Sequence, residues 1–224
     1  MGTVTICILA YLVGSVPFGY LLVAAATGED LRSYGSGGTG AINASRVGGP
    51  WIGLLTLAAD VGKAAAITVA AAATRRPAVI AAAALSVLVG HIYSAWFLVR
   101  GGRRPESKGV ACALGVMIGL AQSRVLPWGL ALLPLGVWLF GLLVPRALTG
   151  RWYWVSPVTM LATLVLPLAV WLAHPALPYL VLSVMMAGLI LIRHKGNLQR
   201  LRAGTEPRWG ERVVRTTRAK GDVR

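Results

Sequence analysis

A glycine-rich polar segment at residues 34–43 is the first part of the chain whose residue types suit a chemical task. It reads Tyr-Gly-Ser-Gly-Gly-Thr-Gly-Ala-Ile-Asn and is soon followed by an arginine. Its candidate binding residues are Gly35, Ser36, Gly37, Thr39, Gly40, Asn43 and Arg46. Glycines let successive backbone amides point into one concavity that suits phosphate, and an arginine adds a fork of donors for phosphate oxygens. The segment lacks the Gly-Lys-Ser/Thr ending of a P-loop. It therefore predicts either another kind of phosphate site or a flexible connection between helices.

Two further polar segments carry clustered cations. Residues 100–110 hold four Lys and Arg and three glycines, and a helix beginning near Gly109 would present its amide-rich N-terminus, beside Lys108, to an anion. Residues 193–206 contain His194 and Asn197, which share a face if the last apolar helix continues inward, and they end at Glu206. The alternatives are a charge cluster that orients the protein in a membrane and a basic tail that rests on anionic lipid.

Ionisable residues inside apolar runs form a fourth candidate site. Asp60 and Lys63 share one helix face, and His91 lies in the next apolar run. Counting about 1.5 Å per residue from Trp51 and Arg100 places Asp60 and His91 at a similar depth of about 13 Å, so they can meet. Charges within a bilayer are costly unless paired. The pattern predicts either a functional cluster or a pair that only locks two helices together.

The composition places these residues in a membrane protein. Of 224 residues, 56% are hydrophobic and 13% are charged, and the mean hydropathy is +0.69, whereas soluble domains carry about 25% charged residues. A net charge of +15 would suggest nucleic acid as the partner of a soluble protein. At this hydropathy we instead expect membrane lipids and phosphate-bearing substrates as partners, and no nucleic acid.

Seven apolar runs can supply membrane helices. They cover residues 3–26, 51–73, 78–99, 109–121, 125–144, 153–173 and 176–192. The 13-residue run at 109–121 is short for a span and would otherwise be re-entrant. If all seven cross and the N-terminus is outside, 18 of the 22 Lys and Arg lie inside and only Arg75, Arg76 and Arg124 lie outside, as the positive-inside rule requires. The sequence therefore predicts an all-α integral membrane protein with seven transmembrane helices and a cytoplasmic C-terminus. Residues 1–207 form its single domain, residues 208–224 form a basic tail, and all three polar segments emerge on the cytoplasmic side.

In order along the chain, these motifs resemble those of the bacterial acyl-phosphate:glycerol-3-phosphate acyltransferase family, PlsY. The resemblance runs nearly end to end. The matching segments are Gly-Ser-Val-Pro-Phe-Gly-Tyr at 14–20, Asp-Leu-Arg at 30–32 with Gly-Ser-Gly at 35–37, Asp-Val-Gly-Lys at 60–63, Gly-His at 90–91, Lys-Gly-Val-Ala at 108–111 and the run at 193–207. The last run is the most specific of these matches.

The resemblance implies a multi-pass enzyme of the bacterial plasma membrane that transfers an acyl chain from acyl phosphate to the 1-hydroxyl of glycerol 3-phosphate. The product is lysophosphatidic acid for phospholipid synthesis, and neither a metal nor another cofactor is implied. The residues implied to hold the two phosphates are Ser36, Asn43, Arg46, Lys108, His194 and Asn197. Of these, we expect Ser36, Lys108, His194 and Asn197 to be catalytic. The other expected substrate-binding residues are Gly35, Gly37, Thr39, Gly40, Asp60, Lys63, His91 and Glu206.

This chemistry suits a site that has no nucleophile. An acyl phosphate is already activated, so the protein need only align the hydroxyl with the acyl carbon and neutralise the developing charge. The sequence contains no Gly-x-Ser-x-Gly elbow, in agreement with that view. Either His194 or a phosphate oxygen of the donor would take the hydroxyl proton.

Four departures from the family pattern leave two alternatives open. Gly38 and Ile42 stand where the glycine-rich loop of the family usually has Asn and Thr. Ser94 stands where the family has a Pro soon after the histidine that corresponds to His91, and residues 103–107 are inserted before Lys108. Either Arg103 or Lys108 can serve as the phosphate cation, and we prefer Lys108. One alternative is a diverged relative that acts on another phosphorylated acceptor or binds lipid without catalysis. The other is a small membrane transporter that uses the buried charges as a relay.

Overall fold

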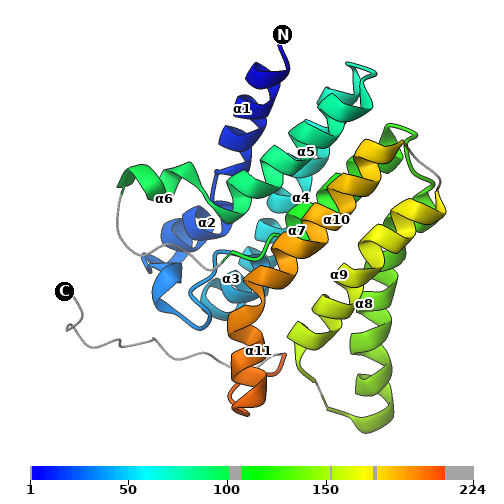
Figure 1. Cartoon of the computed structure of the whole chain (residues 1–224). Helices are drawn as coiled ribbons and strands as arrows, with labels where there is room; N and C mark the ends of the chain where they lie inside the picture. Colours follow the sequence, from blue (N-terminus) through cyan, green and yellow to red (C-terminus); the bar gives the residue numbers. More distant parts are fainter. Residues whose placement is uncertain (1, 101–106, 152, 174–175, 210–224) are drawn as a thin grey trace.

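Helices supply all the regular structure that the computed structural model describes, which covers residues 2–100, 107–151, 153–173 and 176–209 (Figure 1). In chain order the elements are α1 (Thr3–Gly14), α2 (Phe18–Thr27), a short 3-10 helix η1 (Leu31–Ser33), α3 (Ala41–Gly48), α4 (Pro50–Ala72), α5 (Pro77–Ile92), α6 (Ala95–Arg100), α7 (Val110–Gln122), α8 (Trp128–Thr149), α9 (Val155–Leu172), α10 (Leu177–Arg193) and α11 (Lys195–Arg202). The prediction of an all-α fold is confirmed.

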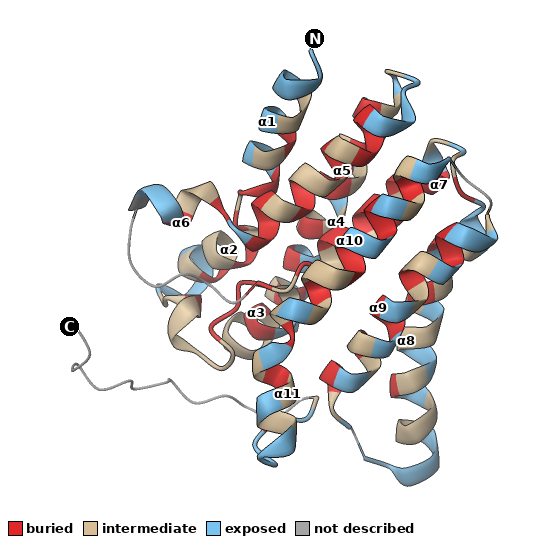
Figure 2. Cartoon of the chain, viewed as in Figure 1, coloured by how far each residue is buried: buried red, intermediate tan, exposed pale blue. Residues whose placement is uncertain are grey.

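The long apolar helices run side by side, and the polar elements gather towards one end of the bundle (Figure 1). We call the end that carries η1, α3 and α11 the polar end. The N-terminus of the chain and the turn between α4 and α5 lie at the opposite end (Figure 1). The buried core lies mainly between α4, α5, α7 and α10, whereas large hydrophobic side chains stay exposed on the outer faces of the bundle (Figure 2). Such faces are typical of helices that contact lipid.

Glycines allow the closest helix crossings. A Cβ atom at Gly14 would lie 2.2 Å from the Val87 carbonyl oxygen, and one at Gly115 would lie 2.2 Å from that of Val61. A Cβ at Gly119 would lie 2.6 Å from the Cβ of Thr68. These positions join α1 to α5 and α4 to α7 at backbone contact, as small residues do in membrane helix pairs.

Two of the predicted apolar runs are broken rather than continuous. Pro17, which has no N–H to donate, separates α1 from α2, and Tyr93 and Ser94 separate α5 from α6. The two breaks are joined because the Ser94 hydroxyl donates to the Ser15 carbonyl at 2.5 Å and the Ala95 N–H donates to Ser15 Oγ at 3.1 Å. Ser94, which replaces the expected proline, thus satisfies a carbonyl that the first break leaves open.

The last apolar helix, α10, is followed directly by a second helix, α11, that is not collinear with it. The chain bends by 45° between α10 and α11, with His194 at the break. Four segments are long and apolar enough to cross a membrane on their own, namely Thr3–Thr27, α4, α8 and α9, and α10 with α11 makes a fifth if the bent pair is one span. The remaining predicted spans correspond to the shorter apolar helices α5 and α7.

Candidate functional site

The glycine-rich loop is held in shape by Asn43, the third residue of α3. Gly35 and Gly37 adopt positive φ angles of 53° and 68°, which glycine tolerates without steric cost. Asn43 Nδ2 lies within hydrogen-bond distance of the carbonyl oxygens of Leu31 (3.3 Å), Tyr34 (3.0 Å) and Gly38 (2.8 Å). In this arrangement the amide nitrogen that was expected to donate to phosphate is used inside the loop.

Contacts through Ser107 bring the three polar segments together. The hydroxyls of Thr39 and Ser107 lie 2.7 Å apart and are both buried. Arg193 at the end of α10 donates through Nε to the Ser107 carbonyl oxygen at 3.1 Å. Thr39 was expected to contact substrate, but its hydroxyl joins the loop to the end of the inserted segment. Residues 101–106, which include Arg103, lie outside the described residues.

His194 lies at the bend between α10 and α11 and is almost fully buried. Its Nδ1 lies 2.8 Å from the Ile190 carbonyl oxygen. Because a carbonyl oxygen can only accept, Nδ1 carries the proton, and a neutral imidazole then has Nε2 available as an acceptor. Lys108, just before the Gly109 cap of α7, and Glu206 are both close enough to act electrostatically on His194. Two expected site residues, one from each of the two cationic segments, therefore lie within electrostatic range of His194.

Glu206 forms the centre of a hydrogen-bonded cluster rather than an open binding group. Ser156 and Asn197 Nδ2 donate to its Oε1, the latter at 2.7 Å, and Arg200 Nε donates to Oε2 at 2.8 Å. Asn197 Nδ2 also donates to Ser156 Oγ at 2.8 Å, so both its N–H groups are used within the protein. Burial alone would raise the pKa of Glu206, but these hydrogen bonds and the charge of Arg200 outweigh burial and lower it below the usual carboxyl value.

The shifted pKa predicts how the cluster responds to acid. A carboxyl whose pKa is lower in the folded state contributes stability that is fully present above its unfolded pKa and is lost as the pH falls through the folded value. The stability from Glu206 should therefore be complete above pH 4.5, its ordinary value, and should be lost as the pH falls further through the lower pKa of the folded state. In detergent, thermal unfolding midpoints measured across acidic pH should fall more steeply for the wild type than for Glu206→Gln. Parallel curves for the two proteins would contradict the prediction.

Ser36 and Arg46 lie on either side of the turn into α3. Gly38 N–H donates to Ser36 Oγ at 3.4 Å within the loop. Arg46 reaches the C-terminal segment, where its Nη2 donates to the Arg208 carbonyl oxygen at 3.4 Å. Ile42, which replaces the expected Thr, has a side chain that is 38% exposed. The loop, α3 and the C-terminal segment thus share the polar end.

Asp60, Lys63 and His91 meet, but they meet inside the bundle beside the break in the first helix. Lys63 Nζ lies 2.8 Å from Asp60 Oδ1 and 3.1 Å from His91 Nδ1. It also donates to the Val16 carbonyl oxygen at 2.9 Å. These three groups surround the ammonium group of Lys63, and Asp60 and Lys63 are both nearly inaccessible. The predicted substrate residues therefore act here as an internal cluster that ties α4 and α5 to the α1–α2 break.

Three residues that assemble this site were not predicted from the sequence. Ser107, Ser156 and Arg193 make the contacts between segments, although none was expected in the site. A serine hydroxyl has no distinctive spacing, so no sequence signal marks Ser107 or Ser156. Arg193 stands beside His194 in the most specific motif, and its adjacency to that motif was the only available signal.

Comparison with known proteins identifies the family. Residues 4–204 match the family model described as glycerol-3-phosphate acyltransferase. The protein of that name from Synechococcus sp. (strain JA-3-3Ab) is 37% identical over 202 residues, which cover 90% of this chain and 91% of that protein. The one from Nitrobacter winogradskyi is 39% identical over 206 residues, covering 91% and 94%.

Solved structures show the same fold. The crystal structure of PlsY (YgiH), described as an integral membrane glycerol 3-phosphate acyltransferase in its glycerol 3-phosphate form, superposes with a TM-score of 0.78 at 31% identity, covering 93% of this chain and 96% of that one. The lysophosphatidic acid form of PlsY gives a TM-score of 0.77 at 30% identity, covering 93% and 95%. By sequence and by fold, the chain belongs to the glycerol-3-phosphate acyltransferase family and is a membrane protein.

Proposed function

We propose that the chain transfers an acyl group from acyl phosphate to the 1-hydroxyl of glycerol 3-phosphate and so produces lysophosphatidic acid. Membership of the family supports the acceptor and the reaction type. The observation that carries the proposal is the junction at Ser107, where the glycine-rich loop, the cationic segment before α7 and the end of α10 are joined. This junction gathers backbone amides and cations suited to two phosphates at one end of the bundle.

In the proposed reaction, the glycerol hydroxyl oxygen forms a bond to the acyl carbon while the bond from that carbon to the phosphate oxygen breaks. Inorganic phosphate leaves, and the hydroxyl proton passes to His194 Nε2, which the tautomer set by Ile190 leaves unprotonated. Lys108, Arg46 and the amides at the start of α7 neutralise phosphate charge. Because the donor is already activated, alignment and electrostatics suffice and no covalent intermediate is needed.

We also propose that all seven apolar segments cross the membrane, with the N-terminus outside and the polar end in the cytoplasm of a bacterial cell. The excess of Lys and Arg at that end supports this orientation. Residues up to 207 would form the membrane domain. Within the tail, Arg208 lies over the Trp154 ring at 5.5 Å, and the ring centres of Trp209 and Trp138 are 5.7 Å apart with the rings tilted. Residues 210–224 lie outside the described residues.

The direct test supplies purified protein with acyl phosphate and glycerol 3-phosphate in the absence of added metal. Lysophosphatidate and inorganic phosphate should then appear in equal amounts. If no lysophosphatidate forms at any acyl-chain length, the proposal is wrong. Labelled acyl phosphate offered with other phosphorylated acceptors would reveal a diverged acceptor preference, which the Gly38 and Ile42 departures motivate. In that case Gly38→Asn with Ile42→Thr should not create activity on glycerol 3-phosphate.

The junction between Thr39 and Ser107 yields a stability prediction. Thr39→Val keeps the side-chain shape but leaves the buried Ser107 hydroxyl without its partner, which should cost about 1–3 kcal/mol. Unfolding in denaturant measures the loss. Thr39→Ser keeps the hydroxyl and is the control, and the double variant Thr39→Val with Ser107→Ala should recover part of the stability. Additive losses in the double variant would show that the two hydroxyls do not act as a pair.

A further inference from the structure

A short non-helical segment follows α11 at the polar end of the bundle. Gly204 adopts a positive φ of 69°, and the Thr205 N–H donates to the Arg200 carbonyl oxygen at 2.8 Å, so α11 ends in a Schellman motif. The chain then leaves the helix, and the side chain of Glu206 is buried in the cluster described above. We call residues 206–209 the strap. Its first residue is therefore fixed inside the protein.

The residues just before α9 hold the backbone of the strap. Trp154 Nε1 donates to the Glu206 carbonyl oxygen at 3.0 Å. The Trp209 N–H donates to the Tyr153 carbonyl oxygen at 3.2 Å. The Arg208 guanidinium lies 5.5 Å from the centre of the Trp154 ring, where a cation is attracted to the ring face. The strap is thus bound at both of its ends by two consecutive residues.

Trp209 also connects the strap to two long apolar helices. Its ring centre lies 5.7 Å from that of Trp138 on α8, with the rings tilted by 60°. Aromatic pairs at this separation stabilise a contact beyond the area that they bury. Trp138 Nε1 in turn donates to the Thr159 hydroxyl of α9 at 3.0 Å. The strap therefore rests on a part of the bundle that is itself joined by hydrogen bonds.

Between its two bonded ends the strap contacts Arg46 of α3. The Arg208 carbonyl oxygen accepts from Arg46 Nη2 at 3.4 Å. A guanidinium is planar and its N–H groups have fixed relative directions, so a bond to one nitrogen restricts where the others point. The strap thus links α3, at the glycine-rich loop, to α8 and α9, which lie far from α3 along the chain.

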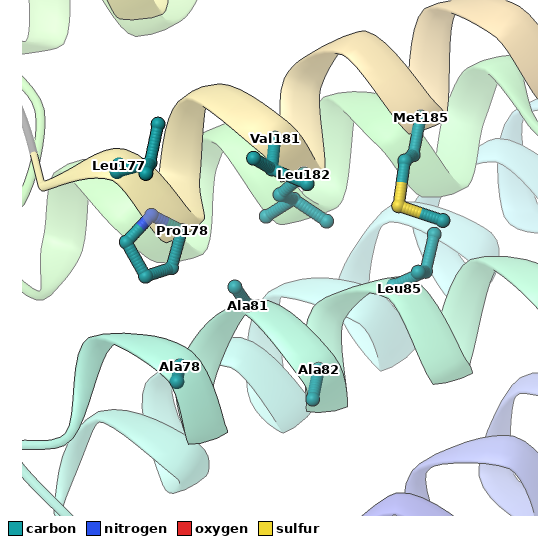
Figure 3. A pocket seen from close by; sticks show the side chains of 9 residues that line it. All are labelled: Ala78, Ala81, Ala82, Leu85, Leu177, Pro178, Val181, Leu182 and Met185. Carbon is teal, nitrogen blue, oxygen red and sulfur yellow. The ribbon is translucent and has the colours of Figure 1, made fainter.

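An apolar groove between α5 and α10 does not contribute to this arrangement. It lies in the half of the bundle that is distant from the polar end (Figure 3). Its lining includes Ala78, Leu85, Val181 and Met185, and every lining side chain is apolar. The groove therefore offers no side-chain acceptor to a guanidinium, whereas the strap offers a backbone carbonyl.

We propose that the strap positions Arg46 for phosphate, and that Trp154 and Trp209 are positioning residues of the acyl transfer. This inference rests on the proposed function, since the phosphate belongs to a substrate of that reaction. Both tryptophans act through the backbone of the strap and not through contact with substrate. The strap holds the carbonyl, the carbonyl orients the guanidinium, and the guanidinium binds the phosphate.

The test is a double-mutant cycle on kcat/KM between Trp154 and Arg46. Trp154→Ala removes the bond to the Glu206 carbonyl oxygen and the ring next to Arg208. We expect kcat/KM to fall by about tenfold to a hundredfold, the loss that follows when a positioning group moves by about 1 Å. In the Arg46→Ala background the same substitution should cost less than about twofold, because no guanidinium remains to be misplaced. A purely structural role would lower activity by the same factor in both backgrounds.

The kinetic constants and two further variants sharpen the test. The substrate whose KM rises in Arg46→Ala should also be the one whose KM rises in Trp154→Ala. Trp154→Phe keeps an aromatic ring next to Arg208 but loses the N–H donor, so its loss should be smaller than that of Trp154→Ala. Trp51→Ala is the matched control, because Trp51 is 75% exposed at the start of α4. It should leave kcat/KM nearly unchanged.

The outcomes separate this inference from the proposed function. Equal losses in the two backgrounds would overturn the inference, and so would a wild-type kcat/KM in Trp154→Ala. If the wild type forms no lysophosphatidate, the proposed function fails first and the inference fails with it. Should Trp154→Ala not assemble, Trp209→Ala removes the ring contact with Trp138 and enters the same cycle with Arg46→Ala. Equal losses there would also overturn the inference.

Discussion

The Arg46→Ala protein should form lysophosphatidate at least about a hundredfold more slowly than the wild type. Arg46 lies in the last turn of α3, near the glycine-rich loop, and reaches the C-terminal segment through the Arg208 carbonyl oxygen. A guanidinium that holds phosphate with two charge-assisted hydrogen bonds contributes about 1.5–3 kcal/mol through each. Losing both corresponds to a decrease in kcat/KM between about a hundredfold and ten-thousandfold. The measurement is steady-state product formation at varied glycerol 3-phosphate and acyl phosphate.

Two variants show whether the loss comes from phosphate binding. Arg46→Lys keeps the positive charge but not the planar fork, so its activity should fall between those of the wild type and Arg46→Ala. Arg202→Ala removes an exposed cation from α11 at the same end of the bundle and should leave activity nearly unchanged. Near-normal kcat/KM in Arg46→Ala would show that α3 does not supply a phosphate ligand.

The helices could be predicted from the sequence because the hydrophobicity that a helix needs to cross a bilayer is a property of a whole run of residues. Each predicted run contains an apolar helix. Hydropathy does not register a local change in backbone hydrogen bonding, so the interruptions at Ser94 and His194 were not predicted. Each depends on a partner distant in sequence or on a bend, and neither changes the average hydropathy of its run.

The residues of the candidate site were easier to predict than their partners. Asn43 and Asn197 were expected to donate to phosphate, but Asn43 organises the glycine-rich loop and Asn197 holds Glu206. An amide donates equally well to a carbonyl, a carboxylate or a phosphate. Its position in a motif therefore identifies a donor without identifying the acceptor, which only the folded arrangement specifies.

The buried charges also show that a sequence can identify polar residues without identifying all of their partners. The estimate of depth from helix rise correctly brought Asp60 and His91 together. It gave no sign that Lys63 also binds the Val16 carbonyl oxygen, because that contact depends on the break before Pro17. The cluster therefore satisfies one of the carbonyls at the break while neutralising Asp60.

Lys63→Met should lower the free energy of unfolding by about 3–5 kcal/mol, the cost of leaving a buried ion-pair partner uncompensated. It should also reduce activity, because α2 begins just after the break and packs directly on the glycine-rich loop. A Cβ at Gly19 in α2 would lie only 2.0 Å from the Thr39 carbonyl oxygen, so a shift of α2 must move the loop. Thermal unfolding in detergent and product formation measure the two effects. An unchanged unfolding midpoint would contradict the prediction.

The double variant Asp60→Asn with Lys63→Met separates a structural cluster from a substrate-binding one. It removes both charges together, and neutral replacement of a buried ion pair is often tolerated, so most of the stability lost in Lys63→Met should return. If the cluster only positions the α1–α2 break, activity should return in proportion to stability, and this is the result we expect from contacts that lie wholly inside the protein. A double variant that is stable but inactive would instead assign Asp60 or Lys63 a direct role with substrate, because a lost charge would then matter after the fold has been restored.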